Sequence, residues 1–118
     1  IHTHMCYSDF NDIFDAIVDL DADVLSIENS KSDEKLLNIF AVKKYPQEVG
    51  PGLFDIHSPR VPSVEEMSVI FDNVIKYIPK EHAWINPDCG LKTRGWPETE
   101  AALTNLVEVA RQFRAKYA

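Results

Sequence analysis

Four side chains that often bind metal ions follow short apolar segments of this 118-residue sequence. His4 and Cys6 are two positions apart, so on a strand both side chains would point to the same face. Glu28 comes directly after a second such segment, and Cys89 lies three positions after another. Together they offer one imidazole nitrogen, two thiolates and a carboxylate oxygen, a donor set that suits a four-coordinate zinc ion. The pattern predicts a metal site if the fold brings these segments together.

Alternating strand and helix signals predict a fold that brings these segments together. Short apolar or β-branched segments followed by polar or Gly/Pro-rich loops indicate buried strands at 1–6, 23–27, 52–56 and 83–86. Apolar stripes indicate helices over about 9–20, 32–44, 63–78 and from 97 onward. Ser63 and Glu66 form a capping box, and Pro79 is expected to stop the third helix. In the last helix one apolar face is expected to hold Leu103, Leu106, Val107, Ala110, Phe113 and Tyr117.

This βαβαβαβα order predicts an α/β fold with a parallel sheet. Four βα units make half of an eight-unit barrel, although a small open doubly wound sheet has the same order. No G-x-G-x-x-G fingerprint follows any strand, so nothing supports a dinucleotide-binding fold. In parallel α/β barrels the active site lies at the carboxyl ends of the strands. The four candidate ligands and His57 all fall at such ends.

The residues alone leave other interpretations open. A His-x-Cys pair on a strand is often packing, a Glu after a strand is often a cap, and a lone Cys is often a small buried apolar residue. Cys6 and Cys89 are also compatible with one disulfide or with two free thiols. His57, with Asp55 two positions before it, suits either a proton donor or a hydrogen-bonded histidine at a strand end. On the pattern alone, the metal and packing interpretations are equally open.

The charge of the chain narrows the classes of partner. A formal net charge of -7 argues against nucleic-acid and anionic-membrane binding, which need clustered Lys and Arg. No apolar run approaches the ~18 residues needed to span a bilayer.

Four stretches, 1–8 (IHTHMCYS), 26–30 (SIENS), 52–59 (GLFDIHSP) and 86–96 (NPDCGLKTRGW), resemble the zinc-site part of cobalamin-independent methionine synthases. The resemblance implies a cytoplasmic enzyme that transfers a methyl group from 5-methyltetrahydrofolate polyglutamate to homocysteine. It implies zinc ligands at His4, Cys6, Glu28 and Cys89, and a proton donor at His57. It also implies that residues 1–118 are the C-terminal half of a TIM-type (β/α)8 catalytic barrel. The other barrel half and an N-terminal domain would then belong to the same polypeptide, and the segment is not expected to fold alone.

Three competing functions share some of these features. Another zinc-thiol methyltransferase, with a corrinoid or a small methyl donor, would use the same ligands. A structural zinc site usually has four firm ligands and is often rich in Cys, and a zinc hydrolase needs a metal-bound water. Lys92, Arg94, Trp96 and Arg60 fit either loop ordering or contact with folate, and they are left out of the predicted site.

Overall fold

The computed structural model describes residues 1–6, 14–29 and 35–117. In these ranges strands and helices alternate from β1 to α3, the helices η1 and α4 follow, and the paired strands are parallel. The predicted beginnings of the first two helices, at residues 9 and 32, lie outside the described ranges. The predicted α/β class with a parallel sheet is confirmed. The elements are β1 (His2–Met5), α1 (Phe14–Val18), β2 (Val24–Ile27), α2 (Lys35–Val42), β3 (Glu48–Pro51), α3 (Val64–Tyr77), the 3-10 helix η1 (Lys80–His82) and α4 (Trp96–Tyr117).

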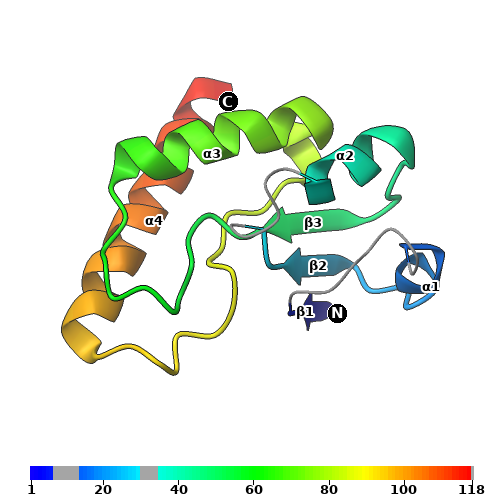
Figure 1. The fold of residues 1–118 in the computed structure, drawn as a ribbon. Helices are drawn as coiled ribbons and strands as arrows, with labels where there is room; N and C mark the ends of the chain where they lie inside the picture. The colour runs from blue at the N-terminus through cyan, green and yellow to red at the C-terminus, as the bar shows by residue number, and fades with distance from the viewer. Residues whose placement is uncertain (7–13, 30–34, 118) are drawn as a thin grey trace.

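The three strands form a sheet in the order β1-β2-β3 (Figure 1). The central strand β2 buries Val24, Leu25 and Ile27. Three of its four residues are apolar and packed in the core, as in a strand of a parallel sheet, and the fourth, Ser26, is half-buried. Because β2 and β3 are parallel, their carboxyl ends point to the same edge of the sheet, and the loops that follow residues 27 and 51 begin there (Figure 1).

The third strand lies earlier in the chain than predicted. We expected it at 52–56, but β3 ends at Pro51, and bends and turns follow. The Asp55 carboxylate accepts a hydrogen bond of 2.9 Å from the backbone N–H of His57, which closes a turn instead of extending a strand. Ile56 is nevertheless buried in the core. Its apolar character reflects packing and not strand pairing.

The predicted fourth strand at 83–86 is reduced to two isolated parallel bridges. The amide of the Asn86 side chain donates to the Gly50 carbonyl at 3.0 Å and takes the place of main-chain pairing between the bridges. A side chain at Gly50 would block this contact, because its Cβ would lie 1.8 Å from Asn86 Oδ1. Residues 83–86 still run parallel to β3, where a fourth strand of the sheet would lie. The two bridges are Val49–Ala83 and Gly52–Asn86.

Helix α3 begins and ends where the sequence predicts. The Ser63 hydroxyl accepts a hydrogen bond from the Glu66 amide at 3.1 Å, and the helix ends at Tyr77, two residues before Pro79. The Glu66 carboxylate pairs with Arg60 at 2.7 Å. Thus Glu66 contributes to the cap through its backbone and to the preceding loop through its side chain. The helix buries Met67, Phe71 and Val74.

The buried face of helix α4 differs from the predicted one. It begins at Trp96, one residue before Pro97, and buries residues at spacings of three and four, as one helix face requires. Leu103 and Val107, expected in the core, are 36% and 46% exposed. The apolar stripe is wider than the buried face, and its outer half borders a surface groove of about 770 Å³. The buried residues are Ala102, Leu106, Val109 and Phe113.

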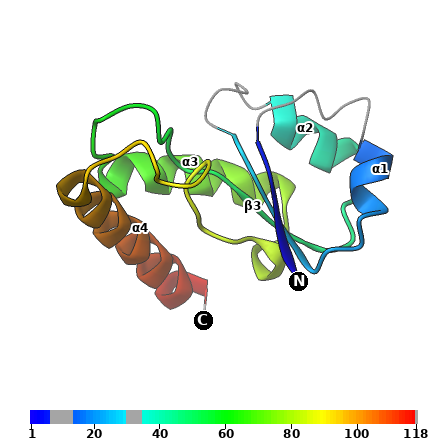
Figure 2. The ribbon, with the colours of Figure 1, turned by 90° about the horizontal axis from the view of Figure 1, so that it is seen from below.

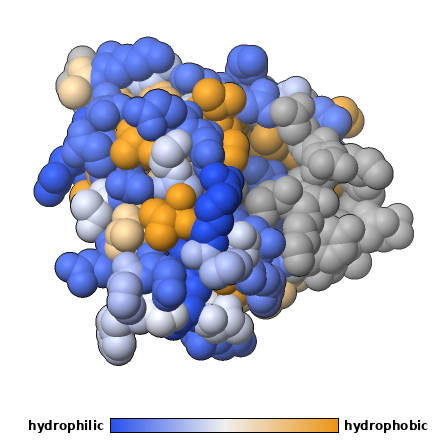
Figure 3. All heavy atoms as spheres, turned by 60° about the vertical axis from the view of Figure 1, so that its left-hand side comes forward, coloured by the Kyte–Doolittle hydropathy of each residue, from blue (hydrophilic) through white to orange (hydrophobic). Residues whose placement is uncertain are grey.

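The helices are distributed over the molecule in the same way in two views. Helices α1 and α2 lie at one end and α4 at the other, with α3 between them (Figures 1 and 2). On the face shown in Figure 3, apolar side chains form separate patches within a mainly hydrophilic surface. None of the helices in the described ranges combines the length and apolar character needed to cross a bilayer.

Candidate metal centre

Three of the four predicted ligands lie together. The ligand atoms of His4, Cys6 and Cys89 are all within 4.8 Å of one another. The two sulfur atoms are 3.7 Å apart, although their residues are 83 positions apart in the sequence. Both thiols are free; Cys6 is exposed and Cys89 is half-buried. Parallel strands explain this convergence, since β1 and the bridged segment before Cys89 both deliver their carboxyl ends to this edge.

Glu28 lies beside this cluster without being one of the three converging groups. It follows β2, and its amide donates to the Met5 carbonyl at 3.3 Å, which ties it to the end of β1. The charge of its carboxylate is near enough to raise the pKa of Cys6. Glu28 therefore borders the cluster as a nearby source of negative charge.

The cluster concentrates negative charge when its thiols ionise. The pKa of Cys6 is raised, first by its hydrogen bond with Cys89, then by the charge of Cys89, by desolvation and by the charge of Glu28. Lys92 opposes this by lowering the pKa of Cys6. A cation placed among these groups would turn the repulsion into attraction. The two thiols, the imidazole and the nearby carboxylate thus fit a soft divalent metal such as zinc.

The orientation of His4 is set by Ser26, its partner in the strand register. The Ser26 hydroxyl donates to the Thr3 carbonyl at 3.4 Å, so its oxygen is free to accept from His4 Nδ1, which lies 2.8 Å away. This assignment places the proton on Nδ1 and leaves a lone pair on Nε2. Outer hydrogen bonds of this kind commonly fix the tautomer and ring orientation of metal-binding histidines.

A buried polar contact joins the two loops that carry Glu28 and Cys89. The Asn29 amide donates to Asp88 Oδ1 at 3.1 Å, and both residues are buried, with 7% and 3% of their surface exposed. Gly52 leaves the necessary room, because a Cβ there would lie 2.0 Å from Asp88 Oδ1. This contact fixes the separation of the two loops.

His57 is not one of the three converging ligands. It is exposed and sits in the turn closed by Asp55. The Asp55 carboxylate accepts a hydrogen bond from the backbone N–H of His57. Asp55 therefore shapes the turn that carries His57.

Sequence reasoning missed Ser26, Asn29 and Asp88. Ser26 is on the strand that ends just before Glu28, but its contact with His4 depends on strand register, which the sequence does not state. Asp88 had a visible signal, because it directly precedes a candidate ligand. Its buried position could not be inferred, since Asp in a Pro-Asp segment is usually a turn residue.

Comparisons with known proteins place the chain in a family. A family model described as the catalytic domain of cobalamin-independent synthase matches residues 1–112. A probable 5-methyltetrahydropteroyltriglutamate–homocysteine methyltransferase of Schizosaccharomyces pombe is 64% identical over the whole chain. The enzyme of that name from Ralstonia pickettii is 58% identical, also over the whole chain. The chain spans 15% of the length of each of these relatives.

A solved structure supports the fold assignment. The chain superposes on a B12-independent methionine synthase from Shewanella sp. W3-18-1, in complex with selenomethionine, with a TM-score of 0.82. The match covers 98% of this chain and 39% of the other, at 17% sequence identity. The fold is therefore that of a segment of a TIM-type barrel. From the family match over residues 1–112, together with the relatives that match its whole length, the chain belongs to the cobalamin-independent synthase catalytic-domain family.

Proposed function

We propose that this chain supplies the metal-binding part of an enzyme that transfers a methyl group from 5-methyltetrahydrofolate polyglutamate to the thiol of homocysteine, giving methionine. The observation that carries the proposal is the convergence of His4, Cys6 and Cys89 within 4.8 Å. Relatives at 64% and 58% identity bear the name of this activity. The enzyme would act in the cytoplasm, where thiols such as Cys6 and Cys89 stay reduced.

Residues 1–118 would form the C-terminal half of the catalytic barrel. The other half and an N-terminal domain of the same polypeptide would supply most contacts with folate and with the amino-acid part of homocysteine. The 15% share of the relatives' length supports this division. The groove of about 770 Å³ beside α4 also supports it, because Trp84 and Val107, which line it, are large apolar residues left exposed.

The metal is proposed to be zinc, held by His4, Cys6, Cys89 and Glu28. When bound, it would supply positive charge that favours the thiolate form of homocysteine. Within the protein, Ser26 would hold the His4 ring with Nε2 toward the metal. Glu28 would complete the set from the end of β2. It is the ligand expected to leave the metal when homocysteine binds, because its carboxylate oxygen is the least soft of the four donor atoms.

His57 is proposed to be the proton donor of the reaction. The substrate sulfur forms a bond to the methyl carbon while the bond between that carbon and N5 of the folate breaks. The electron pair of the broken bond stays on N5, which is a poor leaving group unless it takes up a proton. Histidine exchanges protons near neutral pH, so His57 can supply that proton and regain one from water.

The first test is the zinc content of the complete enzyme and of its Cys89→Ala variant, with His82→Ala as a matched control. His82 lies in η1 and is not one of the converging ligand groups. We expect about one zinc per chain in the parent and the control, and a marked loss in Cys89→Ala. No zinc in the parent, or full retention in Cys89→Ala, would refute the proposed site.

A further inference from the structure

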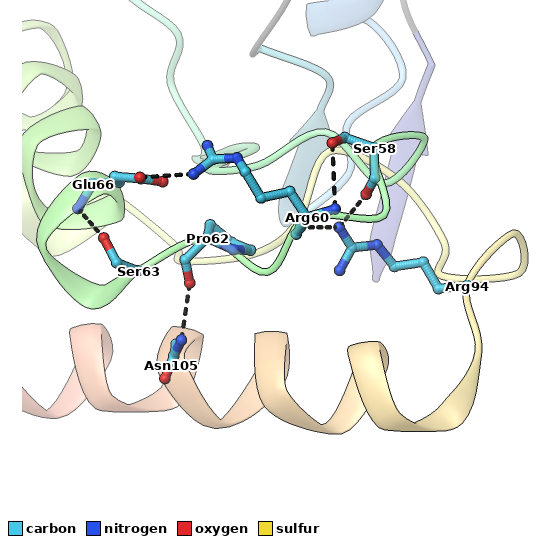
Figure 4. Close-up of polar contacts among 7 residues, drawn as sticks. All are labelled: Ser58, Arg60, Pro62, Ser63, Glu66, Arg94 and Asn105. Atoms are coloured by element: carbon cyan, nitrogen blue, oxygen red, sulfur yellow. Dashed lines mark hydrogen bonds and ion pairs between the residues drawn. The ribbon is translucent and has the colours of Figure 1, made fainter.

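The guanidinium of Arg94 holds the main chain on both sides of His57. Its Nε donates to the Ile56 carbonyl at 3.3 Å. Its Nη2 donates to the Ser58 carbonyl and, at 2.7 Å, to the Arg60 carbonyl (Figure 4). Three carbonyls that bracket His57 therefore converge on one side chain.

The neighbours of Arg94 strengthen this hold. The Thr93 hydroxyl donates to the same Ile56 carbonyl at 3.2 Å. The guanidinium carbon lies 5.2 Å from the centre of the Phe54 ring, within the range of a cation–π contact. Since Thr93 and Arg94 follow Cys89 in one loop, they join the segment with a proposed metal ligand to the segment with the proposed proton donor.

Arginine is the residue type that this arrangement requires. Its planar fork presents donors in fixed directions, whereas the ammonium of lysine is a single point. Arg94 Nη1 is buried and has no hydrogen-bond partner among the described residues. A buried donor without a partner costs stability, so stability alone is a poor explanation for this side chain.

The other contacts of the loop lie farther from His57. Arg60 pairs with Glu66 at 2.7 Å, and the Asn105 side chain donates to the Pro62 carbonyl at 2.9 Å. Both fasten the end of the loop that leads into α3 (Figure 4). The Arg60 side chain therefore offers a control on the same loop.

We propose that Arg94 is a positioning residue that holds the His57 turn in its reactive place relative to the Cys89 loop. The inference rests on the proposed function for its effect on methyl transfer. It makes a separate claim about the structure, namely that segment 55–61 depends on the Arg94 side chain for its order.

The kinetic test is a double-mutant cycle in the complete enzyme. Arg94→Ala should lower kcat by about tenfold to a hundredfold, because small misplacements of reacting groups have effects of this size. Arg94→Lys should recover little, and Arg60→Gln should leave kcat unchanged. In a His57→Asn background, Arg94→Ala should cause no further loss, whereas equal losses in both backgrounds would overturn the inference.

A second measurement does not depend on activity. Hydrogen exchange of the amides in segment 55–61 should accelerate in Arg94→Ala, while β2 and zinc content remain unchanged. Unchanged exchange in 55–61 would overturn the inference whatever the kinetics. If His57→Asn keeps full activity while exchange accelerates in Arg94→Ala, the proposed proton donor fails, and the structural claim about Arg94 stands.

Discussion

The backbone amide of Asn29 donates a hydrogen bond to the buried carboxylate of Asp88, 3.1 Å away. Asn29 directly follows Glu28, and Asp88 directly precedes Cys89. One buried contact thus sets how far apart two proposed metal ligands lie.

Removing this contact should weaken both the fold and the metal site. Asp88→Ala leaves the buried Asn29 amide without this acceptor, so we expect a loss of about 1–3 kcal/mol in the free energy of unfolding. Zinc content should fall as well. Asp88→Asn keeps an oxygen acceptor and should lose less of both. Denaturant unfolding and metal analysis of the complete enzyme test this, and equal behaviour of the two variants would contradict it.

Ser26 should control metal affinity without binding the metal. Ser26→Ala removes the acceptor for His4 Nδ1, so the ring loses its fixed tautomer and orientation. Losing an outer partner of this kind typically costs about 10–100-fold in metal affinity. Chelator competition would measure the change. Ser26→Thr keeps a hydroxyl and should retain most of the affinity; a Thr variant as weak as the Ala variant would argue against the hydrogen bond as the cause.

Metal removal should make the two cysteines sensitive to oxidation. Their sulfur atoms are 3.7 Å apart, so a small movement allows a bond. With the metal stripped and diamide added, the two thiols would give two electrons and two protons to the diamide and form a disulfide. Mass spectrometry would detect the Cys6–Cys89 crosslink. The metal-loaded enzyme should be protected, and equal oxidation of both forms would contradict the shared site.

The Arg60–Glu66 pair should contribute to stability in a pH-dependent way. The hydrogen bond from Arg60 lowers the pKa of Glu66 below its ordinary value of 4.5. A lowered pKa in the folded state means that the contribution is fully present above pH 4.5 and is lost as the pH falls through the lower value.

Thermal unfolding of the parent and of Arg60→Gln across this pH range tests the pair. We expect a small difference in Tm at neutral pH, since both side chains are exposed. The difference should shrink toward acid pH and with added salt. A difference that grows toward acid pH would rule out the pair as its source.

The sequence predicted the convergence of His4, Cys6 and Cys89 because parallel strands end at a common edge, and the strands themselves were visible as apolar segments. It misplaced the third strand, since Ile56 is equally apolar in a packed turn as it would be in a strand. It predicted too wide a buried face for α4, because Leu106 is buried in the core while its neighbour Val107, equally apolar, is 46% exposed.

The role of Arg94 could not be predicted for a different reason. Its partners are main-chain carbonyls, and every residue has one, so no side-chain pattern reveals them. Contacts of this kind become visible only when the path of the loop is known. Sequence patterns therefore found the residues that offer ligand atoms and missed those that hold them in place.

The separation of 83 positions between Cys6 and Cys89 also constrains when the proposed metal can be acquired. During synthesis, a growing chain that carries His4 and Cys6 still lacks the second thiol. Even the finished chain lacks the site until the sheet has assembled. Loading would therefore come late, after folding, and metal affinity would include free energy from folding. The fraction of chains with bound metal would then report the fraction of molecules that have finished folding.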